Sequence, residues 1–164
     1  MARLVLVGLP GAGKTTVARA VGARLGCRAI DTDEVLAAMV ASPAPDHLRA
    51  VGEARFRLDE VAALSASVAH EDVVSTGGGV VESEAARQIL AAQLTLWLDA
   101  PDDVLVSRVG DGDRPLLAGD ARSAIAALRA RRGAWYRDVA RARIDAAGPI
   151  EVVVEDVLRA MMAS

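Results

Sequence analysis

A glycine-rich loop near the amino terminus limits the folds open to this chain. Residues 8–15 read Gly-Leu-Pro-Gly-Ala-Gly-Lys-Thr and match the pattern G-x-x-x-x-G-K-[ST] in full. The apolar run 3–7 before it predicts a strand buried on both faces. Apolar residues at helical spacing predict a helix over 14–25, with Gly26 at its carboxyl end. A strand that passes through such a loop into a helix predicts an α/β fold.

The same alternation continues along the chain. Further strands are expected at 28–31, 72–76, 94–98 and 143–145. Helices are expected near 34–41, 47–69, 83–92, 102–108, 121–138 and 150–162, although 152–154 could also form a strand. This order predicts one domain over residues 1–164, a three-layer α/β/α sandwich around a five-stranded parallel sheet.

Two segments interrupt the pattern. Ser-Pro-Ala-Pro at 42–45 breaks a helical region, and the glycine-punctuated stretch 110–119 has no period. We expect a mobile lid at about 109–119.

Composition excludes several classes of partner. A net charge of −3 and a pI near 5.4 supply no basic field for nucleic acid. Cys27 is the only cysteine, so no internal disulfide can form. The apolar stretch at the amino terminus is too short, and is interrupted by glycine too early, to be a signal or membrane segment. These features predict a cytoplasmic protein with no membrane or nucleic-acid partner.

The loop predicts a nucleotide-binding site. Its small residues let backbone N–H groups turn toward phosphate, and the helix that follows adds its positive dipole end. Lys14, the only lysine among 19 basic residues, is expected to bridge the β- and γ-phosphates, and the Thr15 hydroxyl to bind Mg²⁺. The predicted ATP contacts in this region are Gly11, Ala12, Gly13, Lys14, Thr15 and Thr16. The loop alone leaves the reaction open, because nucleotide kinases, GTPases and motor ATPases share it.

Two acidic residues follow the second predicted strand. Asp31 and Asp33 would project at the carboxyl edge of the sheet, where ligands bind in open α/β folds. We expect Asp31 to hold Mg²⁺ through water or to orient the acceptor hydroxyl, and Asp33 to accept hydrogen bonds from acceptor hydroxyls. The structural alternative is that Thr32 or Asp33 caps the following helix.

Three consecutive glycines, Gly77, Gly78 and Gly79, follow the third predicted strand. Glycine loses more backbone entropy on folding than other residues. A chain tolerates this cost where a ligand must approach the backbone closely or where φ must be positive. Their N–H groups could bind a carboxylate.

Several arginines complete the set of candidates. Arg57 and Glu60 are three residues apart, which by itself favours an ion pair on a solvated helix. Arg129, Arg131 and Arg132 similarly favour a solvated basic face. Arg114 lies in the predicted lid, where it could neutralise charge on the γ-phosphate in the transition state.

Taken together, six motifs resemble the shikimate kinase family. They are the loop at 8–15, Asp31-Thr-Asp33, Gly52-Glu-x-x-Phe56-Arg57-x-x-Glu60, Thr76-Gly-Gly-Gly79, Arg114-Pro-Leu-Leu and Arg132-x-x-x-Tyr136. The triple glycine and the 52–60 motif are the specific ones.

The resemblance implies a nucleoside monophosphate kinase-like fold, with a substrate-binding segment at about 33–61 and a lid at about 109–119. It implies an enzyme that transfers the γ-phosphoryl group of ATP to the 3-hydroxyl of shikimate with Mg²⁺, on the route to chorismate, and acts as a monomer. Asp33 would hold shikimate hydroxyls. Arg57, Gly78 and Arg132 would hold its carboxylate, with Gly77 and Gly79 beside them.

For the nucleotide, Arg114 resembles a lid arginine on the phosphates, and Arg108 corresponds to one that packs on adenine. The chain departs from the family at 41–46, which forms part of the pocket wall, and at Gly148-Pro149, where the family often places a polar residue against adenine.

Two alternatives remain. One is a kinase of another small hydroxy acid, such as gluconate, because of the unusual segment 41–46. The other is a nucleotide-binding module without catalysis. Lys14, Thr15, Asp33 and Arg114 argue against the module, because simple binding requires neither an acceptor acid nor a lid cation.

Overall fold

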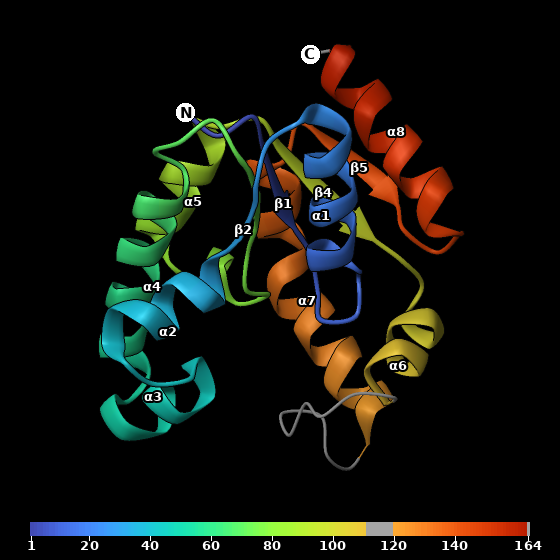
Figure 1. Cartoon of the computed structure of the whole chain (residues 1–164). Coiled ribbons are helices and arrows are strands. Elements are labelled where there is room, and N and C mark those ends of the chain that lie inside the picture. The colour runs from blue at the N-terminus through green and yellow to red at the C-terminus, as the bar shows by residue number, and fades with distance from the viewer. Residues whose placement is uncertain (111–119, 164) are drawn as a thin grey trace.

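A parallel five-stranded sheet forms the centre of the computed structural model, which describes residues 1–110 and 120–163 (Figure 1). The strands are β1 (Leu4–Val7), β2 (Ala29–Asp31), β3 (Val73–Ser75), β4 (Thr95–Asp99) and β5 (Ala142–Asp145). Their spatial order is β2-β3-β1-β4-β5, and every neighbouring pair is parallel. The predicted fold class is confirmed.

The position of each strand in the sheet follows from its composition. Every residue of β1, β3 and β4 is buried, as expected for strands covered on both faces. β1 lies between β3 and β4, with Leu4 beside Val73 and Val5 beside Thr95. The edge strands β2 and β5 are more exposed.

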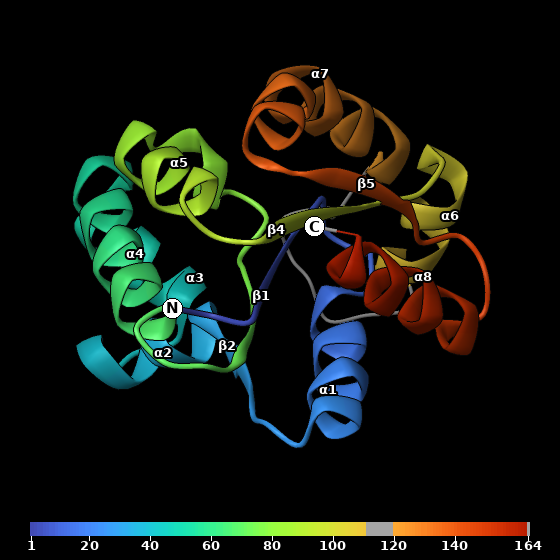
Figure 2. The ribbon, with the colours of Figure 1, turned by 90° about the horizontal axis from the view of Figure 1, so that it is seen from above.

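Helices cover both faces of the sheet. They are α1 (Lys14–Leu25), α2 (Thr32–Val40), α3 (Ala44–Val51), α4 (Glu53–Ser67), α5 (Glu84–Ala91), α6 (Asp102–Gly110), α7 (Ala121–Val139) and α8 (Ile150–Met162), with a 3₁₀ turn, η1, at Val80–Glu82. Figure 2 shows α1 and α8 on one face of the sheet and α5 and α7 on the other. This arrangement gives three layers.

Local signals set several helix ends. Gly26 closes α1 in the left-handed conformation with φ 66°, as predicted. α2 begins at Thr32 because the Asp31 carboxylate accepts a hydrogen bond from the Asp33 N–H at 2.9 Å. The structural alternative, in which Thr32 or Asp33 supplies this cap, is therefore wrong. Val152–Val154 lie in α8, so the strand alternative for them is also wrong.

The helix predicted over 47–69 is two helices that meet at Gly52. Gly52 has φ 80° and ψ 168°, a conformation that residues with a side chain rarely adopt. The first of these helices, α3, begins at Ala44, earlier than predicted. Pro45 fits its first turn, where no backbone N–H is required, so the interruption is shorter than 42–45.

The helices α2, α3 and α4 gather beside the β2 edge of the sheet (Figure 1). They have their own small core, in which Leu36, Phe56 and Ala63 are buried. This core packs α4 against α2 and α3. No helix in the described part of the chain is both long and apolar enough to cross a membrane.

Candidate active site

The loop predicted to bind phosphate joins β1 to α1 and requires glycine at specific positions. Gly8, Gly11 and Gly13 all have positive φ. A Cβ atom on Gly8 would lie 2.3 Å from the Leu98 carbonyl oxygen, and one on Gly11 would lie 2.9 Å from the Leu105 carbonyl oxygen. The loop can therefore lie directly against β4 and α6 only with these glycines.

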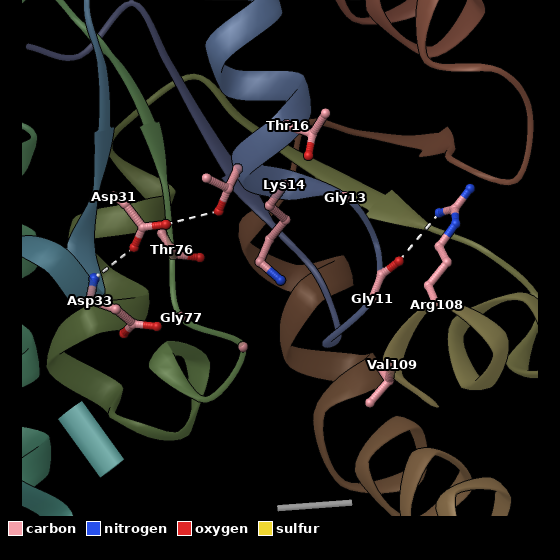
Figure 3. Close-up of a pocket in the computed structure, with 12 residues that line it drawn as sticks. Gly11, Gly13, Lys14, Thr16, Asp31, Asp33, Thr76, Gly77, Arg108 and Val109 are labelled. Atoms are coloured by element: carbon pink, nitrogen blue, oxygen red, sulfur yellow. Dashed lines mark hydrogen bonds between the residues drawn. The ribbon is translucent and has the colours of Figure 1, made fainter. Parts of the chain in front are cut away.

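A pocket of about 300 Å³ opens at this loop, at the carboxyl ends of the strands (Figure 3). The pocket collects most of the residues that the sequence predicted for the site. They are Gly11, Gly13, Lys14, Thr15, Thr16, Asp31, Asp33, Gly77, Gly78 and Arg108. Segments far apart in the sequence thus meet at one edge of the sheet, where open α/β folds bind ligands.

Lys14 is held in place by the loop itself. Its Nζ donates to the carbonyl oxygens of Gly8 at 2.7 Å and of Leu9 at 3.1 Å, and the residue is buried. An ammonium group on a compact loop is a point charge suited to phosphate.

Thr15 and Asp31 bring oxygen atoms together on the β2 side of the pocket. The Thr15 hydroxyl donates to Asp31 Oδ2 at 2.8 Å, and the Ser75 hydroxyl donates to the same oxygen at 3.3 Å. Oxygen donors of this kind suit Mg²⁺, which keeps several waters and binds few protein groups. No cluster of three or more acidic, histidine or cysteine side chains suited to a metal occurs within residues 1–110 and 120–163.

The triple glycine allows side chains to approach the backbone closely. A Cβ atom on Gly77 would lie 2.8 Å from Asp33 Oδ1, and one on Gly79 would lie 2.7 Å from Arg57 Nη1. None of the three glycines has positive φ. Positive φ is therefore not the reason for the triple glycine. The close neighbours of these glycines in the structure are side chains of the protein, and the approach of a ligand stays a prediction.

Arg57 on α4 and Arg132 on α7 converge on this glycine segment. Arg132 approaches the same segment as Arg57. Its Nη2 would lie 3.2 Å from a Cβ on Gly79, and its Nη1 would lie 3.3 Å from a Cβ on Gly78. The side chains of Arg57 and Arg132 are only 19% and 12% exposed. The Nε atoms of both are buried without a hydrogen-bond partner. This geometry places two fork-shaped donors beside the glycine backbone, in which the Gly77 N–H already donates to Thr32 Oγ1 at 3.1 Å.

Arg57 is neutralised by buried acids. It donates to Glu60 at 2.8 Å and to Glu82 at 2.7 Å. Burial disfavours the charged form of Arg57, but these carboxylates outweigh it, so the pKa of Arg57 is raised. Burial also raises the pKa of Glu60, against the effect of Arg57. The predicted Arg57–Glu60 pair exists, but its expected position on a solvated face is wrong.

The basic run on α7 also differs from the expected solvated face. Arg129 donates to Asp99 at 2.9 Å and to Asp102 at 2.6 Å, and so ties α7 to the end of β4. Arg132 faces the glycine segment, and only Arg131, with a side chain 60% exposed, matches the expectation.

Arg108 lies between the phosphate-binding loop and the segment after β5. It donates to the carbonyl oxygens of Gly11 at 3.3 Å and of Ala146 at 2.7 Å. A second pocket of about 230 Å³ adjoins it, lined also by Ala12 and Gly148. Arg114 and positions 111–119 of the predicted lid lie outside the described residues.

Sequence reasoning missed Glu82, which contacts three arginines of this site. Its side chain is 7% exposed and reaches Arg57, Arg131 and Arg132. No local pattern marks it, because its partners lie on α4 and α7, far from η1 in the sequence.

Comparisons with known proteins agree with this geometry. A family model described as "Shikimate kinase" matches residues 10–162. A shikimate kinase of Corynebacterium jeikeium is 35% identical over 93% of this chain and 85% of its own length. The structure of a shikimate kinase from Acinetobacter baumannii in complex with shikimate has a TM-score of 0.90 and 27% identity, and the match covers 98% of this chain and 92% of that one.

A gluconokinase from Sinorhizobium meliloti 1021 is a more distant structural neighbour. Its TM-score is 0.66 at 18% identity, over 98% of this chain and 91% of that one. At this identity the likeness shows a common fold alone.

Proposed function

The chain belongs to the shikimate kinase family, and from this premise we propose that it transfers the γ-phosphoryl group of ATP to the 3-hydroxyl of shikimate. One observation supports the acceptor most directly. Arg57 and Arg132 converge on the backbone of Gly78 and Gly79, beside the pocket that holds the phosphate-binding loop. Two guanidinium forks and backbone N–H groups suit a planar carboxylate.

Asp33 lies between this arginine pair and the nucleotide loop in the proposed arrangement. It lines the pocket with Lys14 and approaches Gly77 closely. A carboxylate in this position can accept hydrogen bonds from acceptor hydroxyls and can take up the proton of the hydroxyl that attacks. We assign it this role because the acceptor carboxylate, bound at Gly78 and Gly79, would leave its hydroxyls facing the loop.

The phosphate-binding loop supplies charge and orientation for the donor. Backbone N–H groups of residues 11–16 would bind the phosphates at the start of α1. Lys14 is already oriented by its contacts with Gly8 and Leu9, so its charge requires little reorganisation on binding. Catalysis in this proposal comes from positioning and electrostatics, without a covalent protein intermediate.

Thr15 and Asp31 are the residues that we expect to hold Mg²⁺, Thr15 directly and Asp31 through water. Their oxygens are already 2.8 Å apart. When bound, the ion would neutralise charge on the phosphate oxygens. We further propose that the pocket beside Arg108, Ala12 and Gly148 receives the adenine base.

A coupled assay of ADP release tests the acceptor. The purified protein with ATP and Mg²⁺ is supplied with shikimate, with gluconate, or with no acceptor. We expect saturable turnover with shikimate and background rates in the other two reactions. Turnover with gluconate alone would overturn the proposed acceptor. ATP binding without turnover on either acid would instead favour a binding module.

A further inference from the structure

Glu82 is a buried carboxylate at the proposed acceptor site. It ends η1, directly after the glycine segment, and its side chain is 7% exposed. Arg57 Nη2 donates to Glu82 Oε2 at 2.7 Å, and Arg132 Nη2 lies 3.6 Å from the same oxygen. Arg131 pairs through its Nε with the other oxygen, Oε1. One carboxylate of the protein thus contacts both arginines assigned to the acceptor.

Two of the nitrogen atoms that Glu82 contacts, Arg57 Nη2 and Arg132 Nη2, also lie close to Gly79. Arg57 Nη2 would lie 2.9 Å from a Cβ on Gly79, and Arg132 Nη2 would lie 3.2 Å from it. Arg57 Nη1 already donates to Glu60 at 2.8 Å. An acceptor carboxylate bound at Gly79 must therefore share these groups with Glu82.

Charge at the site makes this sharing unfavourable. Glu60 and Glu82, both nearly buried, already face Arg57, and their charges outweigh the effect of burial on its pKa. A third carboxylate next to them would meet like charge in surroundings that screen it poorly. Glu60 suffices to orient Arg57, because it lies one turn along α4 and is hydrogen-bonded to it.

We propose that Glu82 is an internal carboxylate that competes with the carboxylate of the acceptor for Arg57 and Arg132, and so sets the affinity for the acceptor. This inference rests on the proposed function. In this account Glu82 tunes affinity and is not a catalytic residue, because it acts through the arginines.

The substitution E82Q tests the proposal directly. Gln keeps the shape of the side chain and an oxygen that can accept from Arg57, but it removes the charge. We expect the KM for shikimate to fall about three- to tenfold, the size expected for one like charge that solvent partly screens. The kcat and the KM for ATP should change less than twofold.

E53Q is the matched control. Glu53 also pairs with Arg57, at 3.6 Å, but its side chain is 64% exposed. Its removal should change the KM for shikimate less than twofold, because exposed pairs contribute little. A KM for shikimate that is unchanged or raised in folded E82Q contradicts the proposal.

Arg131 provides an independent test that leaves Glu82 in place. Its side chain is 60% exposed, and in R131Q Glu82 would lose one partner and pair more strongly with Arg57 and Arg132. We expect the KM for shikimate to rise at least threefold in R131Q, but by much less in the E82Q/R131Q double variant. An unchanged KM in R131Q, or an equal rise in both backgrounds, contradicts the proposal. If the wild-type protein fails to turn over shikimate, the proposed function itself is wrong.

Discussion

The proposed role of Arg57 and Arg132 depends on glycine, because Gly78 and Gly79 have no side chain that would occupy the space next to the guanidinium groups. Arg57 approaches Gly79, and Arg132 approaches both Gly78 and Gly79, so closely that a Cβ atom there would meet a guanidinium nitrogen at 2.7–3.3 Å. The same proximity places the glycine backbone next to the guanidinium donors. At the residue scale, the site therefore depends equally on arginine and on glycine.

Replacing Arg132 with Lys should weaken acceptor binding selectively. A lysine keeps the charge but loses the fork that can bind both oxygens of a carboxylate. We expect R132K to raise the KM for shikimate about 10-fold or more, and the KM for ATP less than twofold. Steady-state kinetics with each substrate varied in turn measures both values. An equal rise in both would show that Arg132 is not at the acceptor.

Replacing Gly79 with Ala should impair binding more than stability. The atoms that the new Cβ would meet are the ends of flexible arginine side chains, which can move at low cost. Their displacement should raise the KM for shikimate about 10-fold, while the melting temperature changes by only a few degrees. The control is G133A, where a Cβ meets nothing within 4 Å. A wild-type KM in G79A would contradict the proposed acceptor position.

The joint between α3 and α4 determines where Arg57 points. Gly52 ends one helix and precedes the next, and its φ of 80° with ψ of 168° turns the chain between them. His47 on α3 also reaches Asp59 on α4, with 2.7 Å between Nε2 and Oδ2. At the scale of elements, this corner orients the first turns of α4, from which Arg57 extends toward the sheet.

The substitution G52A should strain this corner. Its backbone conformation is close to exclusive to glycine, so we expect a loss of about 1–3 kcal/mol in the free energy of unfolding. Denaturant unfolding measures the loss. G133A is the matched control, because glycine inside α7 costs about 0.5–1 kcal/mol relative to alanine, so this variant should be stabilised. Equal free energies of unfolding for G52A and G133A would mean that alanine is not strained at position 52.

Tyr136 joins the layers of the molecule. It is fully buried on α7, lies 5.8 Å from Trp97 of β4 between ring centroids, and donates to the Gly78 carbonyl oxygen at 2.5 Å. The glycine segment is thereby fixed to both a helix and the central sheet. At the scale of the whole molecule, the proposed acceptor site is continuous with the hydrophobic core.

The ionisation of Tyr136 should report global unfolding. Burial raises its pKa well above the ordinary value of 10. The unfolded chain loses the phenolic proton near pH 10, while the folded chain keeps it. The contribution of Tyr136 to the free energy of unfolding is therefore fully present below pH 10. Above pH 10 the free energy of unfolding should fall by about 1.4 kcal/mol per pH unit.

Tyr136 is the only tyrosine, so tyrosinate absorbance measures it alone. We expect this absorbance to appear together with the loss of circular dichroism as pH rises, and near pH 10 in chemically denatured protein. A tyrosinate signal near pH 10 in protein with native circular dichroism would contradict this prediction.

Local patterns were enough to predict much of the architecture. The strands of the sheet and the helix after the phosphate-binding loop could be predicted because burial and periodicity are written in neighbouring residues. The division at Gly52 could not, because an isolated glycine inside a helical pattern is tolerated and gives no φ value. The solvated faces expected for Arg57 and Arg132 were wrong because exposure depends on what packs against a helix.

The phosphate-binding loop, the parallel sheet and the family could be inferred from the sequence alone, since each depends on residues that are contiguous or regularly spaced. Tertiary structure decided which charges meet. Glu82 contacts Arg57 and Arg132 only because η1, α4 and α7 pack together beside the sheet. Electrostatic interaction depends on distance in space and on burial, and neither is encoded in the local order of residues.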